Sequence, residues 1–263
     1  MWNLRALVLT LAAALALAPV ARADLITRLP TGDKVVALTF DACQAREAAA
    51  FDKPLLDYLL ARKLPFTLFV SGRFAETNAA DLQRLALEPQ VEFGNHAWDH
   101  PNTMDTFTPE AVQRQAQRAD TEIEAITGRA PRFFRFPAGN HNAAGLAAIE
   151  AMGMPVVHWR WASGDPSRAE TAGRLHDRVL RLVEPGDILI FHINGRGWHT
   201  AEALPRIVES LEAEGYRFVQ LSDYIATPRK PATAIERTAR RAEDLISRAV
   251  QGAAGQVPFG GAL

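Results

Sequence analysis

The sequence predicts an α/β fold built on a parallel sheet. Short apolar segments alternate with longer segments of helical periodicity, which is the pattern of βαβ units. The length of 263 residues and the hydrophobic content of 48% fit one large domain. The segments expected to form strands are 35–40, 66–70, 91–94, 133–136, 156–159, 188–192 and 218–221. Seven strands in this order fit either an incomplete TIM-like barrel or an open doubly wound sheet.

Helices are expected between these strands. The segments with helical periodicity are 53–62, 79–87, 109–126, 142–151, 170–183 and 201–214. The third has the clearest boundaries, because Thr108 can cap its first turn, Pro109 suits the first helical position, and Gly128 suits its end. No internal repeat interrupts this order.

The first 23 residues are predicted to be a secretory signal peptide. Arg5 precedes an apolar run over 6–20, and Ala21-Arg22-Ala23 is a small-x-small cleavage site. A membrane anchor is the alternative, but the run is shorter than the roughly 20 apolar residues that span a bilayer. We therefore expect cleavage after Ala23, a periplasmic or secreted protein, and no stable membrane span after cleavage.

The chain after the main domain, which is expected over 24–228, has a different composition. The stretch "TPRKP" is typical of a linker, and 229–263 should hold this linker, an amphipathic helix and a flexible tail. The apolar positions of the helix are Ile235, Ala239, Ala242, Leu245, Ile246 and Ala249. We expect this helix to pack on the domain, and a helix that binds a partner or a membrane surface is the alternative.

Charge and cysteine content exclude several classes of protein. The formal net charge of −1 gives no sign of nucleic-acid binding, which usually needs a clustered basic surface. Cys43 is the only cysteine, so the chain has neither an internal disulfide nor a sulfur-rich structural zinc site. Stability must come from a packed core. The sequence predicts no oligomeric state.

Polar residues gather at the carboxyl ends of the expected strands. They are Asp41, His96, His100, Arg135, Asp165 and His192. In a parallel α/β barrel the active site forms at this end, because the loops that follow the strands meet there. The distribution therefore predicts a single site built from several strands.

The stretch "GNHAWDHP" is the strongest single element. His96 and His100 are four residues apart, which places them on one face of a helical turn, as zinc ligation requires. Catalytic zinc usually takes three protein ligands and a water. Surface or capping histidines are the alternative, and the buried strand before this pair favours a metal.

Asp41 and His192 are candidates for general base and general acid. Asp41 ends an apolar strand, and a metal or Arg135 could hold it ionised, whereas a helix-capping role is the alternative. His192 leaves a core strand, and Asp165 could orient it and keep it protonated. A buried neutral histidine is the alternative for His192. Trp198, on the loop that follows, could stack on a sugar ring or simply pack, and the neighbouring His199 is a weaker candidate.

Together these residues resemble the polysaccharide deacetylase family, which contains the NodB-homology domain. The resemblance covers about 33–225, and its five ordered motifs are "TFDAC", "HAWDH", "RFFRFPAG", "WASGDP" and "LIFH". It implies a distorted (β/α)7 barrel that uses a divalent metal, commonly zinc, to hydrolyse acetyl groups on amino sugars or polysaccharides. The fourth motif matches loosely.

The resemblance also implies a role for each matching residue. Asp41 would be the base, Arg135 would orient it, and His192 would be the acid that Asp165 tunes. His96 and His100 would bind the metal. A backbone N–H near Ala138 would help to hold the oxyanion.

The sequence departs from the family pattern at two positions. Ala42 stands where the family usually has a second Asp that binds metal, and Ala138 replaces an aromatic residue. Three outcomes follow for the metal: Asp41 and water complete a weaker site, Cys43 does so from the same strand face, or metal binding is lost. The first is favoured, because the other functional residues remain.

Three functions are therefore compared. The first is a metal-dependent deacetylase acting on an acetylated glycan, with the sugar and the N- or O-linkage left open. The second is a catalytically silent glycan-binding relative that keeps the cleft but has lost its metal, because Ala42 replaces the usual Asp ligand. The third is a cysteine hydrolase using Cys43 and His192. The deacetylase is favoured, because the expected base, acid, histidine pair and arginine are all present.

Overall fold

The structure is a computed structural model that describes residues 25–44 and 47–228, together with Thr238, Ala242 and Ile246. The expected signal peptide lies outside these residues, and so does the tail from residue 229 apart from the three single positions, which are helical and exposed. Within the described part of the chain, no helix combines the length and the apolar content that crossing a membrane requires.

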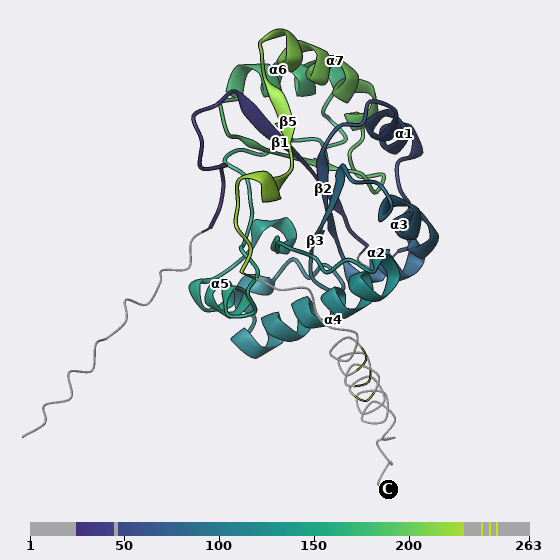
Figure 1. The fold of residues 1–263 in the computed structure, drawn as a ribbon, viewed down its shortest axis with the longest axis vertical. Helices are drawn as coiled ribbons and strands as arrows, with labels where there is room; N and C mark the ends of the chain where they lie inside the picture. Colours follow the sequence, from purple (N-terminus) through teal and green to yellow (C-terminus); the bar gives the residue numbers. More distant parts are fainter. Residues whose placement is uncertain (1–24, 45–46, 229–237, 239–241, 243–245, 247–263) are drawn as a thin grey trace, which may run out of the picture.

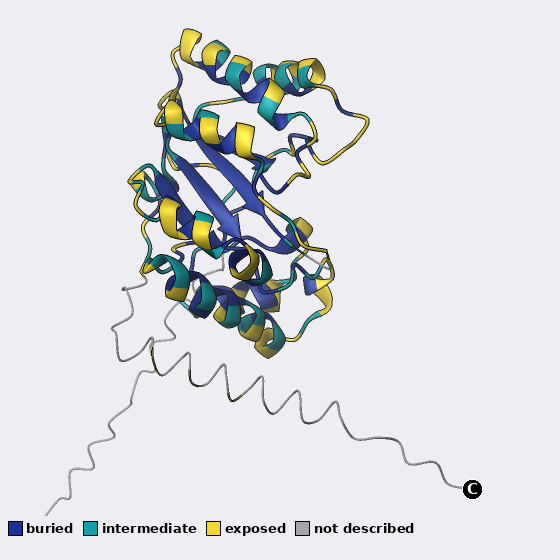
Figure 2. Ribbon diagram, turned by 90° about the vertical axis from the view of Figure 1, so that its right-hand side faces the viewer, coloured by how far each residue is buried: buried dark blue, intermediate teal, exposed yellow. Residues whose placement is uncertain are grey.

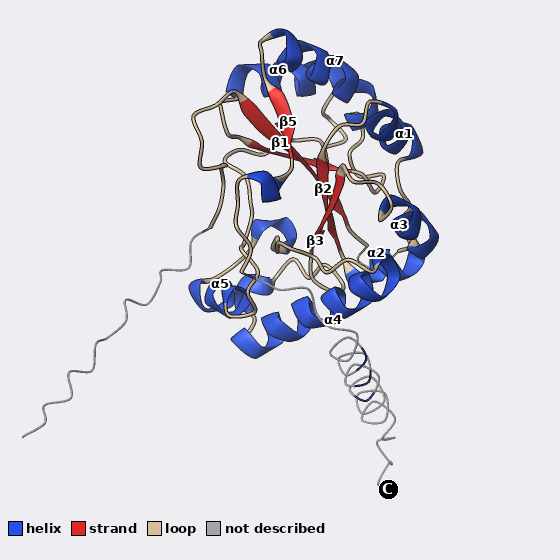
Figure 3. Ribbon diagram, in the orientation of Figure 1, coloured by secondary structure: helices blue, strands red, loops and turns tan. Residues whose placement is uncertain are grey.

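A parallel sheet forms the centre of the fold, and helices surround it (Figure 1, Figure 3). The strands are β1 (Val35–Ala42), β2 (Phe66–Val70), β3 (Val91–Asn95), β4 (Ile188–His192) and β5 (Arg217–Val219). Their order is β3-β2-β1-β4, and β5 pairs with the beginning of β1. The expected α/β fold with a parallel sheet is confirmed.

Two expected strands, 133–136 and 156–159, are present only as isolated bridges. Phe134 bridges Asn95 on one side and Val156 on the other. The ladders stay short because proline, which lacks an N–H, stands at 131, 137 and 155. Further bridges join Ile26 to Val157 and Arg28 to Asp187, directly before β4. These bridges connect the two edges of the sheet, which gives the distorted barrel that the resemblance implied.

The helices agree with the sequence prediction except for one. They are α1 (Lys53–Ala61), α2 (Gly72–Thr77), α3 (Ala79–Leu85), α4 (Pro109–Thr127), α5 (Ala143–Glu150), α6 (Ala172–Leu182) and α7 (Thr200–Ala213), and short 3-10 turns cover Met104–Thr106, Pro137–Gly139 and Leu221–Asp223. The capping of α4 is as predicted, since Thr108 accepts a hydrogen bond from Ala111 N–H and Gly128 ends the helix with φ of 69°. Helix α2 was not predicted, because six residues are too few to show a period.

Strand β1 separates two different environments. Leu38, Phe40 and Ala42 belong to the large hydrophobic cluster between the sheet and the helices, whereas Val35 and Ala37 belong to a second cluster. Successive residues of a strand face opposite sides, so Thr39 and Asp41 continue the face of Val35 and Ala37. Figure 2 shows the buried strands beneath helices whose outer faces are exposed. The polar end of β1 therefore lies inside the barrel.

Gly72, the first residue of α2, is held in close contact with Trp98. Its N–H donates to the carbonyl of Ala97 at 3.0 Å, and the next N–H, of Arg73, donates to the carbonyl of Trp98 at 2.9 Å. A Cβ at Gly72 would overlap the Trp98 ring. The contact positions the segment between His96 and His100.

We predict that Gly72→Ala lowers the free energy of unfolding by about 1–3 kcal/mol, because the added methyl group forces the Trp98 ring to move. Denaturant unfolding measures the change. Gly173→Ala in α6 is the matched control, since a Cβ there meets nothing within 4 Å and should be neutral or stabilising. Equal stability of Gly72→Ala and the natural chain would contradict the prediction.

Candidate active site

The candidate residues meet at the carboxyl end of the barrel strands. Asp41 is the Cα partner of His192 in the parallel pairing of β1 with β4. Paired residues of adjacent strands point to the same face of a sheet, so the expected base and acid are neighbours. Asn95 ends β3, and His96 follows it directly.

Arg135 lies fully buried and contacts Asp41. Its Nη1 donates to Asp41 Oδ1 at 2.9 Å, and its Nη2 donates to Thr39 Oγ1 at 2.9 Å. Its Nε donates to the carbonyl of Val157 at 3.1 Å, and its guanidinium lies 3.9 Å from the centre of the Phe69 ring. Arg135 therefore contacts Asp41 as expected, and its role in orienting a catalytic base stays a prediction.

The surroundings of Asp41 keep its carboxylate ionised. Burial would by itself raise its pKa, but the neighbouring His96 and Arg135, with the hydrogen bond from Arg135, lower the pKa of Asp41 to about 2. Its second oxygen, Oδ2, lies 3.4 Å from His96 Nε2. A carboxylate in this state can accept a proton at neutral pH.

The histidine pair lies on a loop and not on the expected helical turn. In the histidine loop, defined as residues 96–100, Ala97 and His100 have positive φ, of 63° and 54°. A helix does not form because the carbonyls of Ala97 and Trp98 accept from the first N–H groups of α2. The loop nevertheless brings the two imidazole rings together, with centroids 4.9 Å apart.

The hydrogen bonds of His96 leave one ring nitrogen free to bind a ligand. Nδ1 donates to the carbonyl of Arg135 at 2.8 Å, so Nε2 carries the lone pair. This Nε2 atom is buried and has no hydrogen-bond partner in the structure. Burial lowers the pKa of both histidines, that of His100 to about 3, so both rings are neutral.

His192 and Asp165 form the second expected pair. Asp165 Oδ1 lies 2.9 Å from His192 Nδ1, and its Oδ2 accepts from the backbone N–H of His192 at 2.7 Å. Thr200 and Ser163 also donate to this carboxylate, at 2.9 and 3.0 Å. Burial would lower the pKa of His192, but the hydrogen bond and the charge of Asp165 outweigh it and raise that pKa.

Cys43 lies beside the histidine pair. One ring nitrogen each of His96 and His100 lies with the Cys43 sulfur in a group whose atoms are all within 4.8 Å of one another. Asn194 Nδ2 donates to this sulfur at 3.1 Å. Burial and the charge of Asp41 raise the pKa of the thiol to about 12, which makes it a poor nucleophile and weakens the cysteine hydrolase hypothesis.

Donor atoms of this kind fit a divalent metal such as zinc. Neutral imidazole and cysteine sulfur are common zinc donors, and a buried lone pair without a partner needs a ligand to satisfy it. Asp41, the favoured third ligand from the sequence, is not part of this converging group, so that role stays a prediction.

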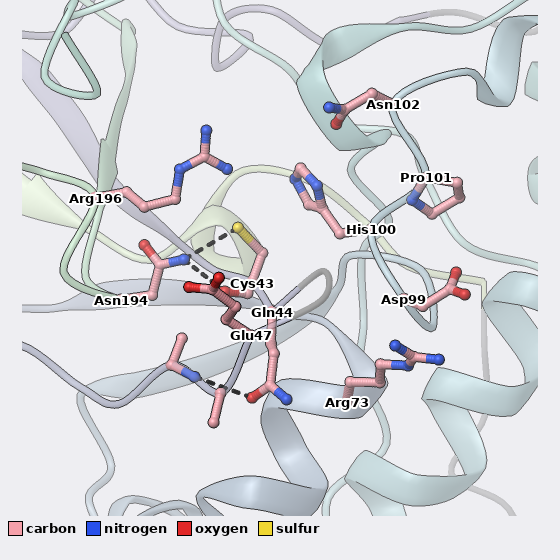
Figure 4. Close-up of a pocket in the computed structure, with 12 residues that line it drawn as sticks. Cys43, Gln44, Glu47, Arg73, Asp99, His100, Pro101, Asn102, Asn194 and Arg196 are labelled. Carbon is pink, nitrogen blue, oxygen red and sulfur yellow. Dashed lines mark hydrogen bonds between the residues drawn. The ribbon is translucent and has the colours of Figure 1, made fainter.

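The site opens into a cavity of about 820 Å³ (Figure 4). Cys43 and His100 are among the residues that line it, and so are four charged residues, namely Glu47, Arg73, Asp99 and Arg196. Figure 4 shows the Cys43 sulfur between the side chains of Asn194 and His100. A cavity of this size can hold part of a sugar chain.

The two expected substrate contacts are less well placed. Trp198 is 44% exposed, but the Arg168 guanidinium lies 4.1 Å from the centre of its ring and covers one face. It is not among the residues that line the cavity. Ala138 is exposed and has a φ of 54° in the turn after Arg135. Their binding roles stay predictions.

Three polar residues at the site were not found from the sequence. Thr39 holds Arg135, Asn194 contacts Cys43, and Thr200 holds Asp165. Strand alternation was a usable signal for Thr39, which lies two residues before Asp41 on the same face. Asn194, two residues after His192, offered a weaker signal of the same kind.

The sequence matches the model of a known family. Residues 28–157 match the polysaccharide deacetylase family. The chain belongs to the polysaccharide deacetylase family. The expected family is therefore confirmed, and the names of the family and of its relatives indicate a hydrolase that deacetylates polysaccharides.

Relatives of this deacetylase-family chain include enzymes and a protein described as inactive. A peptidoglycan-N-acetylglucosamine deacetylase of Bacillus cereus is 28% identical over 204 residues, which are 76% of this chain and 72% of that protein. A family 4 acetyl xylan esterase of Clostridium thermocellum, solved with a cobalt ion, is 25% identical with a TM-score of 0.62, covering 73% and 90% of the two chains.

A family 4 pseudoenzyme from Bacillus anthracis is as similar in sequence to this chain as the acetyl xylan esterase is. It is 25% identical with a TM-score of 0.67, covering 77% of this chain and 69% of that one. Membership of the family therefore does not by itself establish turnover, and the residues of the site must be weighed.

We predict that the Asp41 carboxylate gives the metal-free protein a pH-dependent stability. Its pKa is about 2 in the folded state, against an ordinary value of 3.8. The ionised carboxylate therefore stabilises the fold fully at a pH above the ordinary value. This contribution, about 2 kcal/mol, is lost as the pH falls from 5 toward 2. Asp41→Asn should lack it. Denaturant unfolding in chelator measures the difference between the two proteins at each pH.

The control for this measurement is Asp57→Asn, at an exposed position on α1. A difference between the natural chain and Asp41→Asn that stays constant over this pH range would show that Arg135 does not stabilise the charge of Asp41.

Proposed function

We propose that this protein is a metal-dependent hydrolase that removes acetyl groups from a glycan. The observation that carries the proposal is the pairing of Asp41 with His192 across β1 and β4, each held by its own buried partner. A base and an acid on neighbouring strands, beside a pair of buried histidines, match what amide or ester hydrolysis requires.

Each residue has one task in the reaction. A divalent metal at the histidine pair, when bound, would polarise the acetyl carbonyl and make a water more acidic. Asp41 takes a proton from the attacking water. The hydrogen bond from Arg135 fixes Asp41 Oδ1, and Oδ2 therefore points toward His96. The backbone N–H of Ala138 is the expected donor to the developing oxyanion.

His192 completes the reaction. The water oxygen forms a bond to the acetyl carbon, and the bond from that carbon to the sugar nitrogen or oxygen breaks. His192 gives its proton to the departing atom, which leaves acetate and a free amine or hydroxyl group. Asp165 keeps His192 protonated before this step. No serine or cysteine nucleophile is required.

The proposed substrate is an acetylated glycan of the cell envelope or its surroundings. The names of the relatives support it, since one acts on peptidoglycan N-acetylglucosamine and another on acetyl xylan. The expected signal peptide supports a periplasmic or secreted protein. No nucleic-acid partner is proposed.

A catalytically silent glycan-binding protein is the second candidate. Ala42 stands where the family usually has a metal-binding Asp, and the relative from Bacillus anthracis is a pseudoenzyme. The two candidates differ in one measurable product, acetate. Retention of both buried pairs, Arg135 with Asp41 and Asp165 with His192, favours the enzyme.

We predict that the zinc-loaded protein releases acetate from N-acetylglucosamine oligomers, peptidoglycan or acetylated xylan. His96→Ala, His192→Ala and Asp41→Asn should each lower kcat/KM by at least about 100-fold, because they remove a metal ligand, the acid and the base. Acetate quantification with circular dichroism as a fold check measures this. His199→Ala, which alters a histidine paired with Glu202 at 3.5 Å, is the control.

Two results would contradict this proposal. Near-natural turnover in Asp41→Asn would remove the role assigned to that carboxylate. Glycan binding without detectable zinc or acetate release, in protein made with added zinc, would establish the silent candidate instead.

We also predict that Asp165→Asn changes the pH dependence of kcat/KM. Asp165 raises the pKa of His192, and an acid acts only while it is protonated, so activity falls as the pH rises through that pKa. Asp165→Asn removes the charge, lowers the pKa of His192 and shifts this alkaline limb to lower pH. Asp177→Asn on the surface of α6 is the control. If the alkaline limb of the pH profile does not move in Asp165→Asn, then Asp165 has only a structural role.

A further inference from the structure

The strand geometry gives Cys43 a position that Ala42 does not have. Ala42 is buried in the hydrophobic cluster between the sheet and the helices, whereas Asp41 contacts Arg135 inside the barrel. Because β1 remains extended through Ala42, the next residue returns to the face of Asp41. Cys43 accordingly lines the cavity together with His100.

The atoms around the Cys43 sulfur converge on one point. The sulfur and one nitrogen each of His96 and His100 lie within 4.8 Å of one another, and all three residues are buried. A tetrahedral zinc with bonds of roughly 2.0–2.3 Å separates its donors by about 3.5 Å. The three atoms would have to approach one another to that separation when a zinc ion binds.

A second observation points independently to a ligand here. His96 is fully buried, and its Nε2 has no hydrogen-bond partner, although its Nδ1 donates to the Arg135 carbonyl. Buried polar atoms in folded proteins are nearly always paired, so an unpaired imidazole nitrogen beside a second imidazole and a sulfur indicates a missing bonding partner. A cation supplies that partner.

The Cys43 sulfur accepts a hydrogen bond from Asn194. Its Nδ2 donates to Cys43 Sγ at 3.1 Å and also to the Cys43 carbonyl. Hydrogen bonds of this kind orient metal ligands in proteins and stabilise a charged sulfur. Asp41 Oδ1 is fixed by Arg135, and its Oδ2 lies 3.4 Å from His96 Nε2, but Asp41 is not part of the group of donor atoms that includes the Cys43 sulfur and both histidines.

We propose that Cys43 is the third protein ligand, completing a metal site with His96 and His100 in place of the carboxylate that is usual in the family. The inference rests on the proposed metal-dependent function and assigns its ligand set. It leaves Asp41 as the base alone. A sulfur donor also favours zinc and cobalt over magnesium or manganese, which prefer oxygen.

Cobalt titration of the full chain tests the proposal directly. Cys43 is the only cysteine, so a thiolate-to-cobalt charge-transfer band in the near-ultraviolet spectrum reports on this residue. We expect the band in the natural protein and its loss in Cys43→Ser. Absence of the band in cobalt-loaded natural protein would overturn the proposal, whether or not any variant folds.

Zinc affinity, measured by competition with a chromogenic chelator, provides the second readout. Cys43→Ala should weaken zinc binding by more than about 100-fold, and Asn194→Ala by about 10-fold. Asn102→Ala, in the lining of the same cavity, is the control and should bind zinc normally. Ala42→Asp should not tighten binding, because it places the new carboxylate in the hydrophobic cluster.

The possible outcomes separate this inference from the proposed function. Normal zinc affinity in Cys43→Ala, or tighter binding in Ala42→Asp, would overturn Cys43 as a ligand while acetate release could still establish the deacetylase. A natural protein that binds zinc through Cys43 but releases no acetate would support the ligand set and overturn the function. A natural protein that binds neither zinc nor cobalt would overturn the ligand set.

Discussion

The buried ion pair between Arg135 and Asp41 joins the parts of the site that come from distant segments of the chain. The side chain of Arg135 holds Asp41 and Thr39 on β1, and its carbonyl accepts the hydrogen bond that sets the orientation of His96. Removing one partner of such a buried pair typically costs about 3–5 kcal/mol, because the other charge is left without compensation. One residue thus positions both Asp41 and His96.

The sequence predicted which candidate residues lie close together where a residue's position follows from strand alternation. Asp41 and His192 end core strands, and period-2 alternation with a parallel sheet was enough to place them together. The pairing of Asp165 with His192 followed from the general logic of an acid and its orienting partner. Its further contacts with Thr200 and Ser163 depend on loop packing, which no local pattern encodes.

The sequence was less informative where the backbone departs from regular structure. The spacing of His96 and His100 suggested a helical turn, but the residues between them bond to α2, whose six residues are too short to predict. The segments 133–136 and 156–159 are apolar enough for strands, yet flanking prolines limit them to single bridges. In both cases the types of side chain predicted which segments lie close together, but they did not predict the backbone conformation of those segments.

The alanine at position 42 illustrates the same distinction. Read as a motif, it is a lost ligand, because the family usually has a carboxylate at this position. In the structure the question becomes which way a side chain points at the end of β1, and that depends on where the strand stops. Extension through Ala42 directs position 42 into the core and position 43 into the cavity.

The positive φ angles around the site have an energetic consequence. Among the described residues, non-glycine residues with positive φ are Lys63, Ala97, His100 and Ala138, and the last three belong to the histidine loop or to the turn after Arg135. Each such residue costs roughly 1–3 kcal/mol. Folding has therefore already supplied the energy that shapes these loops before an ion or a sugar arrives. The loops are shaped before anything binds, and glycine in place of Ala97 or Ala138 would relieve the strain and stabilise the fold while loosening the loops that surround the site.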